Sequence, residues 1–235
     1  MIRKKLEKFD PFNINPNTLI FSDLHIQERK DLGFIDPTTG RNPRLDDGLS
    51  ILSQITKILD EHSQIKTILF LGDWFEQKDR IPNHVLQEFA IGFRPIINHN
   101  NGIVFLSTLG NHDYSNQKYP TMNIFSEYDN FVLYSGFGTP ALENGRKIGI
   151  IPFYRNQDQF EEAYTHMFEK KVDIVLMHQD LPGAIYDNNR KVPGDFNLEV
   201  NPKIIYLNGH IHRPQKIKGI QVVGAPYPDE FGCTG

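Results

Sequence analysis

The sequence predicts an α/β fold in which helices cover β-sheets. Short apolar runs rich in Ile, Val, Leu and Phe alternate along the chain with longer segments of helical periodicity. Such runs are typical of strands buried on both faces, so helices must cover the sheets. With 235 residues, 39% of them hydrophobic and 23% charged, the chain is long enough for a substantial core. We expect a single domain over residues 1–235.

Strands are expected at eight places, each marked by a short run of apolar or β-branched residues. In chain order the candidates are Thr18–Ser22, Thr67–Leu71, Ile103–Ser107, Phe131–Tyr134, Lys147–Ile151, Asp173–Met177, Ile204–Leu207 and Gln221–Val223.

The clearest helix is predicted over Arg44–Glu61, where leucine and isoleucine recur at helical spacing on one stripe. Asn42 is the expected cap, with Pro43 at the first helical position. The polar stretch Gln27–Asn42 before it is expected to be a long loop. Weaker helices are predicted over Pro82–Asn98, with a break or bend at Gly92 or Pro95, and over Gln157–Lys170.

The composition restricts the class of protein. A formal net charge of −4 argues against a broad basic surface that coats nucleic acid. It does not exclude a nuclease, since bound divalent metals add local positive charge. The single cysteine, Cys233, cannot form an internal disulfide and fits a reducing compartment. Because the sequence shows no secretory signal and no membrane span, we expect a cytoplasmic protein.

Five short polar blocks carry the candidate site, and each follows an apolar run. Ligand sites of open α/β sheets collect at the carboxyl ends of strands, so these side chains are expected to converge. Five of the nine histidines fall in the blocks. Carboxylate, amide and imidazole groups suit divalent metals, and the set predicts a two-metal site. The blocks are Asp23-Leu24-His25, Gly72-Asp73, Gly110-Asn111-His112-Asp113, His178 and Gly209-His210-Ile211-His212.

The first two blocks have a simple coordination logic. Asp23 and His25 stand at alternate positions, so both can point toward one cation. In isolation this pair could equally be a surface coincidence. Asp73 follows a predicted buried strand, and its two oxygens can bridge two cations. Taken alone, Asp73 would more simply be a helix cap or a turn residue.

The third block combines a ligand with a group for acid catalysis. The Asn111 carbonyl can coordinate a metal, while His112 can stay unligated and act as general acid or as an electrostatic clamp on phosphate. Asp113 is then expected to set the tautomer of His112 and raise its basicity. The alternative interpretation is a polar turn without chemistry.

In this order the blocks resemble the calcineurin-like metallophosphoesterase superfamily, whose pattern is Asp-x-His, Gly-Asp, Gly-Asn-His-Asp/Glu, His and Gly-His-x-His. The resemblance spans residues 23–212. It implies a four-layer α-β-β-α sandwich, with two mixed sheets flanked by helices, and hydrolysis of a phosphate ester by a hydroxide that bridges two metal ions. His112 would contact the scissile phosphate or protonate the leaving oxygen, with support from Asp113. The first metal would be held by Asp23, His25, Asp73 and His212, and the second by Asp73, Asn111, His178 and His210.

The second block indicates the branch of the superfamily. Gly72-Asp73-Trp74-Phe75 lacks the Gly-Asp-x-Val-Asp-Arg-Gly pattern of protein phosphatases and resembles the Gly-Asp-hydrophobic-Phe pattern of SbcD-like nucleases, which act in DNA repair and recombination. The run from Arg44 to Leu49 resembles the start of their first helix. Gly224 to Pro228, with Phe231-Gly232, resembles the segment that closes their core. This implies an exo- or endonuclease with two divalent metals, Mn²⁺ in first place and Fe, Zn, Ni or Mg as alternatives.

One difference from SbcD-like proteins concerns the expected binding partners. SbcD-like proteins continue into a capping domain and into helices that attach an SbcC-like ATPase, whereas this sequence ends at Gly235. We expect either a minimal core enzyme, as in compact bacteriophage members, or a cap supplied by another chain. The predicted helix Pro82–Asn98 lies where the family forms its homodimer contact. Its apolar face could serve that contact or be buried in the monomer, and comprises Val85, Leu86 and Phe89.

DNA is the expected substrate, and the candidate contacts are basic and aromatic. Tyr114 or Trp74 could stack on a base, although core packing is the preferred interpretation of Trp74. A solvated loop is the alternative for the basic residues, which are Arg29, Lys30, Arg41 and Arg44. Two other functions stay open: a small-nucleotide phosphatase or phosphodiesterase, and a non-catalytic scaffold of the same fold.

Overall fold

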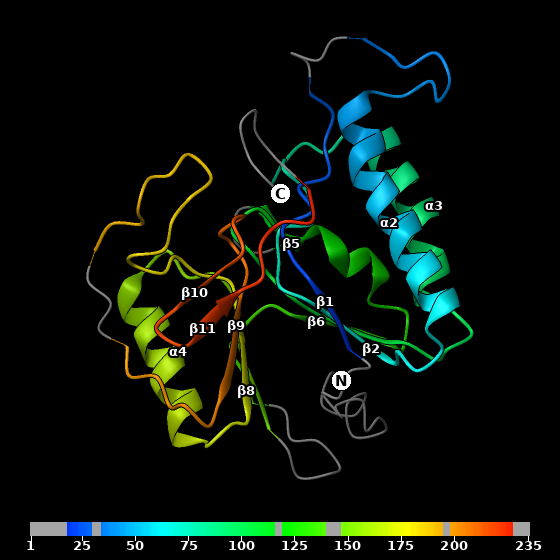
Figure 1. Cartoon of the computed structure of the whole chain (residues 1–235). Coiled ribbons are helices and arrows are strands. Elements are labelled where there is room, and N and C mark those ends of the chain that lie inside the picture. The colour runs from blue at the N-terminus through cyan, green and yellow to red at the C-terminus, as the bar shows by residue number, and fades with distance from the viewer. Residues whose placement is uncertain (1–17, 30–33, 116–118, 140–146, 195–197, 228–235) are drawn as a thin grey trace.

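Two β-sheets pack face to face, and helices cover both outer faces (Figure 1). A computed structural model describes residues 18–29, 34–115, 119–139, 147–194 and 198–227. The first sheet is covered by α2 (Pro43–Glu61) and α3 (Asn83–Ile97), and the second by α4 (Gln157–Glu169). The layer order α-β-β-α confirms the predicted fold class.

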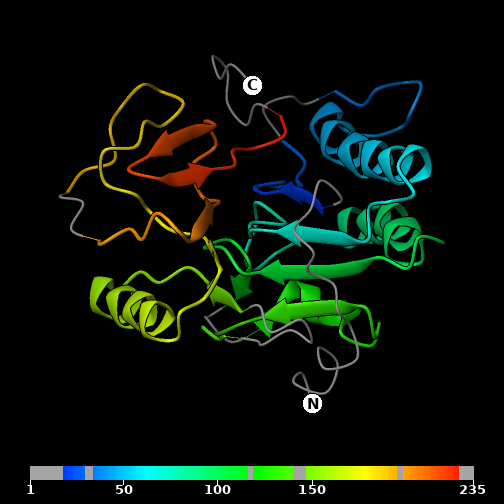
Figure 2. The ribbon, with the colours of Figure 1, turned by 60° about the horizontal axis from the view of Figure 1, so that its bottom comes forward.

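The first sheet is parallel throughout its four strands, whose order is β1-β2-β3-β6. Its register pairs Phe21 with Phe70, and Phe70 with Ser107, so the carboxyl ends of three strands lie at one edge. Figure 2 shows these strands side by side, with α2 and α3 beyond them. The strands are β1 (Thr18–Phe21), β2 (Thr67–Phe70), β3 (Val104–Thr108) and β6 (Phe131–Tyr134).

The second sheet is mixed, because β10 pairs antiparallel with β11 while the other pairs are parallel. Its strand order is β10-β11-β9-β8-β7. The carboxyl ends of β8 and β9 are level, since Met177 pairs with Asn208. The strands are β7 (Ile148–Ile151), β8 (Ile174–Met177), β9 (Ile205–Asn208), β10 (Gln215–Ile217) and β11 (Ile220–Val222).

Alternate side chains of β2 hold the layers together. Ile68 and Phe70 are buried in the cluster that contains α2 and α3, whereas Leu69 and the following Leu71 are buried against the second sheet. Side chains of period two on a doubly covered strand produce this arrangement. Each buried aliphatic or aromatic side chain contributes roughly 1.5–3 kcal/mol, so both faces of the sheet stabilise the sandwich.

All eight predicted strands are confirmed to within one residue at each end, and the three helices are present. Asn42 caps α2 by accepting a hydrogen bond from the Arg44 backbone N–H at 3.1 Å, with Pro43 next, as predicted. The described parts of Gln27–Asn42 contain no helix or strand. A turn through Lys218 and Gly219, both with positive φ, joins β10 to β11. Four elements of two to five residues were not predicted. They are β10, the hairpin strands β4 (Tyr114–Ser115) and β5 (Tyr119–Pro120), and the 3₁₀ helix η2 (Thr121–Phe125).

Helix α3 lacks the predicted break and decides between the two alternatives for its apolar face. It runs unbroken from Asn83 to Ile97 with Pro95 inside. A proline this close to the helix end removes one hydrogen bond, to Ile91, whose side chain is exposed so that water can reach this face. The apolar face considered for a dimer contact packs within the monomer: Val85 and Phe89 are 1% and 0% exposed, and Leu86 is partly buried against the same core. The segment with Phe231 and Cys233 lies outside the described residues.

Candidate metal centre

Five loops that leave the carboxyl ends of strands bring the polar blocks together. The loops after β1, β2 and β3 come from the first sheet, and those after β8 and β9 come from the second. The site therefore lies where both sheets end, as the placement of the blocks predicted. It gathers all seven predicted ligands, which are Asp23, His25, Asp73, Asn111, His178, His210 and His212.

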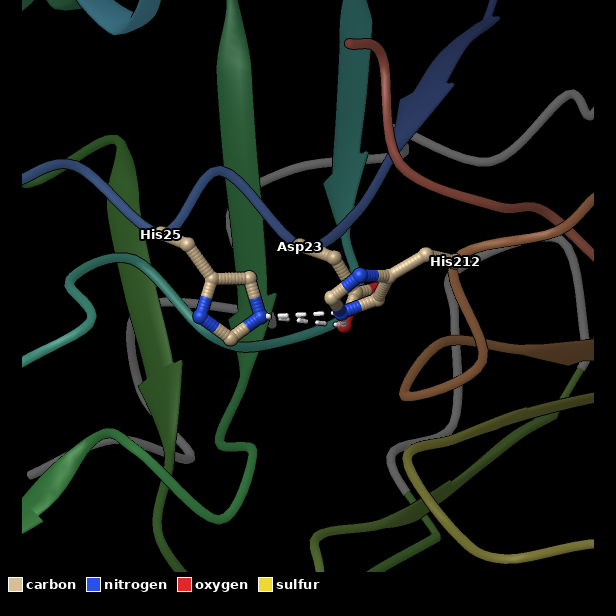
Figure 3. Close-up of side chains that lie close together, drawn as sticks. All are labelled: Asp23, His25 and His212. Carbon is tan, nitrogen blue, oxygen red and sulfur yellow. Dashed lines mark hydrogen bonds and ion pairs between the residues drawn. The ribbon is translucent and has the colours of Figure 1, made fainter. Parts of the chain in front are cut away.

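The first group consists of Asp23, His25 and His212, whose side chains point toward one another in Figure 3. The Nε2 atoms of the two histidines are 3.2 Å apart. Each Nε2 is also 3.8 Å from the same Asp23 oxygen, Oδ1. Two imidazole nitrogens and a carboxylate oxygen thus face one small space, which is a suitable donor set for a divalent metal.

The second group consists of Asp73, Asn111, His178 and His210. The Asn111 side-chain oxygen is 2.9 Å from His210 Nδ1 and 3.2 Å from His178 Nε2. His178 Nε2 is also 3.2 Å from Asp73 Oδ2. This group supplies two nitrogens and two oxygens from four different loops.

Asp73 lies between the two groups. Its Oδ2 atom is 3.5 Å from His25 Nε2 in the first group and 3.2 Å from His178 Nε2 in the second. The carboxylate is fully buried, so its charge is not screened by water. This position fits the ligand that was predicted to be shared.

Two histidines have their outer nitrogens fixed by hydrogen bonds. His25 Nδ1 is 2.7 Å from Glu76 Oε2. His178 Nδ1 donates to the Leu71 carbonyl oxygen at 2.6 Å, since a carbonyl can only accept. In both rings Nε2 then faces the group centre, where it can offer its lone pair to a metal once it has lost its proton, which is the arrangement that metal-ligating histidines require.

The other two histidines have carboxylates behind them as well. His210 turns the opposite edge of its ring inward, because Nε2 is 3.0 Å from Asp180 Oδ1 while Nδ1 faces Asn111. His212 Nδ1 is 3.7 Å from Asp187 Oδ2. Every candidate imidazole therefore has one nitrogen supported from outside and one directed inward. The residues present fit two bound divalent cations.

The backbone at the site is held in an uncommon conformation. Asp23, His25, Asp73 and His210 have positive φ values of 57°, 42°, 64° and 72°. The left-handed region costs a non-glycine residue about 1–2 kcal/mol, and such residues cluster at functional sites. Gly110 permits the close approach of the loops, since a Cβ atom there would lie 2.2 Å from Asp73 Oδ1.

Opposite charges dominate the electrostatics of the buried groups. Burial raises the pKa of Asp73, but the nearby His178 and His25 outweigh it, and the pKa is lowered. Burial lowers the pKa of His178, but the charge of Asp73 and its hydrogen bond raise it to about 9. For Asp23, burial raises the pKa, but the hydrogen bond with His25 and the charges of His178 and His212 together outweigh it, so the pKa is lowered. Without metal, protons on His25 and His178 balance the buried carboxylates.

The predicted role of Asp113 is wrong. Its buried carboxylate accepts hydrogen bonds from the backbone N–H groups of Gly110, Asp73 and Trp74 at 2.7, 2.7 and 2.8 Å. Burial, with a contribution from the charge of Asp73, raises the pKa of Asp113 to about 7. Asp113 therefore joins two site loops through their backbones rather than orienting His112.

Glu76 takes the place that was expected for Asp113. His112 Nδ1 donates to the Glu76 carbonyl oxygen at 2.6 Å, and the Glu76 carboxylate is 3.5 Å from the same nitrogen. That carboxylate also holds His25, so one residue supports both histidines. Glu76 lies in the loop of Asp73, and Asp180 lies two positions after His178. Their closeness to predicted ligands was the available sequence signal.

Two of the arginines predicted to contact DNA have other partners within the protein. Arg44 is buried, with its guanidinium carbon 4.3 Å from the centre of the Tyr227 ring, so it is unavailable to DNA. The charge of Arg41 is neutralised within the protein by Glu88 at 2.7 Å and Asp46 at 3.5 Å.

The two aromatic candidates also differ. Trp74 is fully buried and donates from Nε1 to Ser107 Oγ at 3.0 Å, which confirms core packing and excludes base stacking. Tyr114 lines a cleft that reaches Asn111.

An α-β-β-α sandwich with two groups of candidate metal ligands at its strand ends is the arrangement of a metal-dependent phosphoester hydrolase. The sequence profile described as calcineurin-like phosphoesterase matches residues 16–214, and the chain belongs to this family. This confirms the resemblance at the level of the superfamily. The sequence has no match among curated proteins. None of the helices in the described ranges combines the length and the apolar character of a membrane span.

Proposed function

We propose that the protein is a DNA nuclease of the SbcD-like type that uses two divalent metal ions. The observation that carries phosphodiester hydrolysis is the pair of ligand groups that share Asp73, with His112 beside them. Two bound cations would activate water and neutralise charge at phosphorus. A mixed set of nitrogen and oxygen donors suits Mn²⁺, with Fe, Zn, Ni and Mg as alternatives.

His112 is the proposed group that contacts the substrate. Its backbone N–H donates to Asp73 Oδ1 at 2.8 Å, and its Nδ1–H is held by the Glu76 carbonyl oxygen, which leaves Nε2 for the substrate. The side chain is 22% exposed, so a phosphate can reach it. When protonated, Nε2 can donate to a phosphate oxygen or to the leaving oxygen.

A contact below the first ligand group supports the SbcD-like assignment. The chain segment after β11 returns to α2, where Tyr227 packs on Arg44 and donates a hydrogen bond to the Leu24 carbonyl oxygen. A Cβ atom at Gly48 would lie 3.2 Å from the Tyr227 hydroxyl, so glycine makes room for this ring. The start of α2 and the Gly224 segment, which separately resemble SbcD-like proteins, thus meet beneath the Asp23–His25 turn.

The test is incubation of the purified protein with Mn²⁺ and labelled single- and double-stranded DNA. We expect metal-dependent cleavage, and its absence from both substrates would overturn the nuclease proposal. Turnover of cyclic or mononucleotides without action on DNA would instead identify a small-nucleotide phosphatase or phosphodiesterase. A protein that binds metal but hydrolyses none of these substrates would be a scaffold of the same fold.

A variant separates the role of His112 from metal binding. His112→Ala should abolish hydrolysis and leave the metal content at about two ions per chain. His84→Ala is the matched control, since His84 is exposed and pairs with Glu28 away from the ligand groups. Unchanged turnover in His112→Ala would refute the role assigned to His112.

A further inference from the structure

A cleft of about 780 Å³ adjoins the candidate metal centre at Asn111. Its walls come from both halves of the sandwich. The loop with Lys78 follows β2 of the first sheet, Tyr114 lies in the hairpin strand β4 that follows β3, and the segment from Phe153 to Asn156 follows β7 of the second sheet. Pockets of ~300–1,000 Å³ hold small organic ligands, so this space is large enough for a nucleotide unit. The cleft is therefore positioned to receive the part of a substrate that flanks the reacting phosphate.

Two cations of the cleft are available to an anionic ligand. Lys78 and Arg155 line it, and neither has a hydrogen-bonding or ionic partner among the described residues. This distinguishes them from Arg41, which two carboxylates neutralise. One carboxylate, Asp79, also lines the cleft, so the local balance is one net positive charge. The amino-terminal end of α4 borders the same space through Asn156, and its dipole adds to the attraction of an anion.

Three aromatic rings also line the cleft. Tyr114 and Tyr154 are both half-buried, so each ring is anchored and retains an exposed part. The backbone of Tyr154 is fixed on both sides by Gln179, which accepts from its N–H at 3.1 Å and donates to its carbonyl at 2.8 Å. Phe153 continues this wall to the centre, with its ring 5.4 Å from the ring of His210.

We infer that this cleft binds an unpaired DNA strand next to the scissile phosphate, an inference that rests on the proposed nuclease function. Lys78 and Arg155 contact backbone phosphates, and Tyr114 and Tyr154 stack on bases. Cations combined with exposed aromatic faces are the features by which proteins hold single strands. Inside a duplex both faces of each base are covered by neighbouring bases, so these rings can stack on internal bases only where the strand is unpaired.

The cations are tested by binding of a hydrolysis-resistant phosphorothioate thymidine oligonucleotide to the metal-loaded protein. The double variant Lys78→Ala/Arg155→Ala should weaken binding and make the slope of log affinity against log salt shallower by about 1.4, since each phosphate contact contributes about 0.7 on single strands. Lys203→Ala/Lys216→Ala is the matched control, because both side chains are exposed and outside the cleft. The control should keep the wild-type slope.

The aromatic wall is tested by Tyr154→Leu, with Tyr119→Leu as the control because Tyr119 is 72% exposed and outside the cleft. Loss of one stacked base should reduce affinity roughly 5- to 150-fold. Thermal unfolding of each variant shows whether it is folded. If Tyr154→Leu does not fold, the cation variant decides the question.

Hydrolysis of bis(p-nitrophenyl) phosphate separates the two proposals. If the wild type hydrolyses this small diester but cleaves no DNA, the nuclease proposal fails and this inference fails with it. If the wild type cleaves DNA and the cleft variants bind the oligonucleotide like their controls, only this inference fails. Tighter binding of a blunt duplex than of the single strand would also overturn it. For the cation variant, the ratio of DNA turnover to diester turnover should fall at least about tenfold.

Discussion

Removal of the Glu76 carboxylate should impair the metal centre and the substrate group together. Glu76 Oε2 lies 2.7 Å from His25 Nδ1 and 3.5 Å from His112 Nδ1. In Glu76→Ala the Nδ1 atom of His25 loses its acceptor, so the ring is free to change its tautomer and orientation. Metal affinity should then fall, and turnover should fall with it.

The magnitude follows from the contact and its exposure. A hydrogen bond to a charged group contributes about 1.5–3 kcal/mol, and loss of such a supporting partner costs about 10–100-fold in metal affinity or activity. The Glu76 side chain is 33% exposed, so water replaces part of the interaction. We therefore expect the lower end, about tenfold. Glu76→Gln should recover part of the loss, because its amide oxygen can still accept from His25.

The assay is metal affinity by competition with a chelator, together with kcat on a phosphodiester. Glu28→Ala is a close control, since Glu28 forms a similar carboxylate–histidine pair with His84 at 2.8 Å and is 30% exposed. Equal metal affinity and equal kcat in the Glu76 and Glu28 variants would refute the reasoning. A defect in Glu76→Gln as large as that in Glu76→Ala would show that the negative charge matters more than the hydrogen bond.

Three further predictions concern the packing and protonation of the site. Gly110→Ala should lower the free energy of unfolding by about 1–3 kcal/mol in chemical denaturation and reduce the metal content, because the added Cβ would lie 2.2 Å from Asp73 Oδ1. Gly136→Ala is the control and should change neither quantity, since a Cβ atom there has no neighbour within 4 Å. Trp74→Ala should lower the free energy of unfolding by roughly 3–5 kcal/mol, since this fully buried indole fills the core beneath the site, and a loss below 1 kcal/mol would contradict that placement. Metal binding at pH 7 should release protons: the pKa of His178 is raised to about 9 and that of His25 is also raised, so both rings are protonated without metal and must lose a proton to ligate it. Affinity should accordingly rise with pH up to about 9, and calorimetry in buffers of different ionisation enthalpy should detect the released protons; release of none would show that these rings are already neutral.

Much of the fold could be predicted because its local signals agree with its tertiary structure. Continuous apolar runs mark strands that are buried on both faces, and β2 and β8 are such strands. The hairpin strand β10 was missed because its three residues, Gln215 to Ile217, are mostly polar and only partly buried. The break predicted near Pro95 is absent. Helix propensity takes account of the hydrogen bond that a proline removes, but not of the fact that Pro95 lies next to the end of the helix.

The partners of charged side chains could not be predicted in the same way. Arg41 and Arg44 lie three positions apart in the sequence. Arg41 nevertheless forms ion pairs, whereas Arg44 is buried beside Tyr227, which lies far along the chain. Asp113 follows His112 directly, but its carboxylate faces the backbone of a different loop. Glu76 reaches His25 across 51 positions of sequence. Such pairings depend on how loops from separate strands meet.

The amino-acid sequence alone was sufficient to predict which side chains converge at the site, because each polar block follows an apolar strand and parallel strands deliver their carboxyl ends to one edge. It was likewise sufficient for the family. Only the tertiary structure decided which nitrogen of each histidine faces the metal groups, which carboxylate supports His112, and which cations remain available in the cleft. These properties depend on distances of a few ångströms between loops that are remote in sequence.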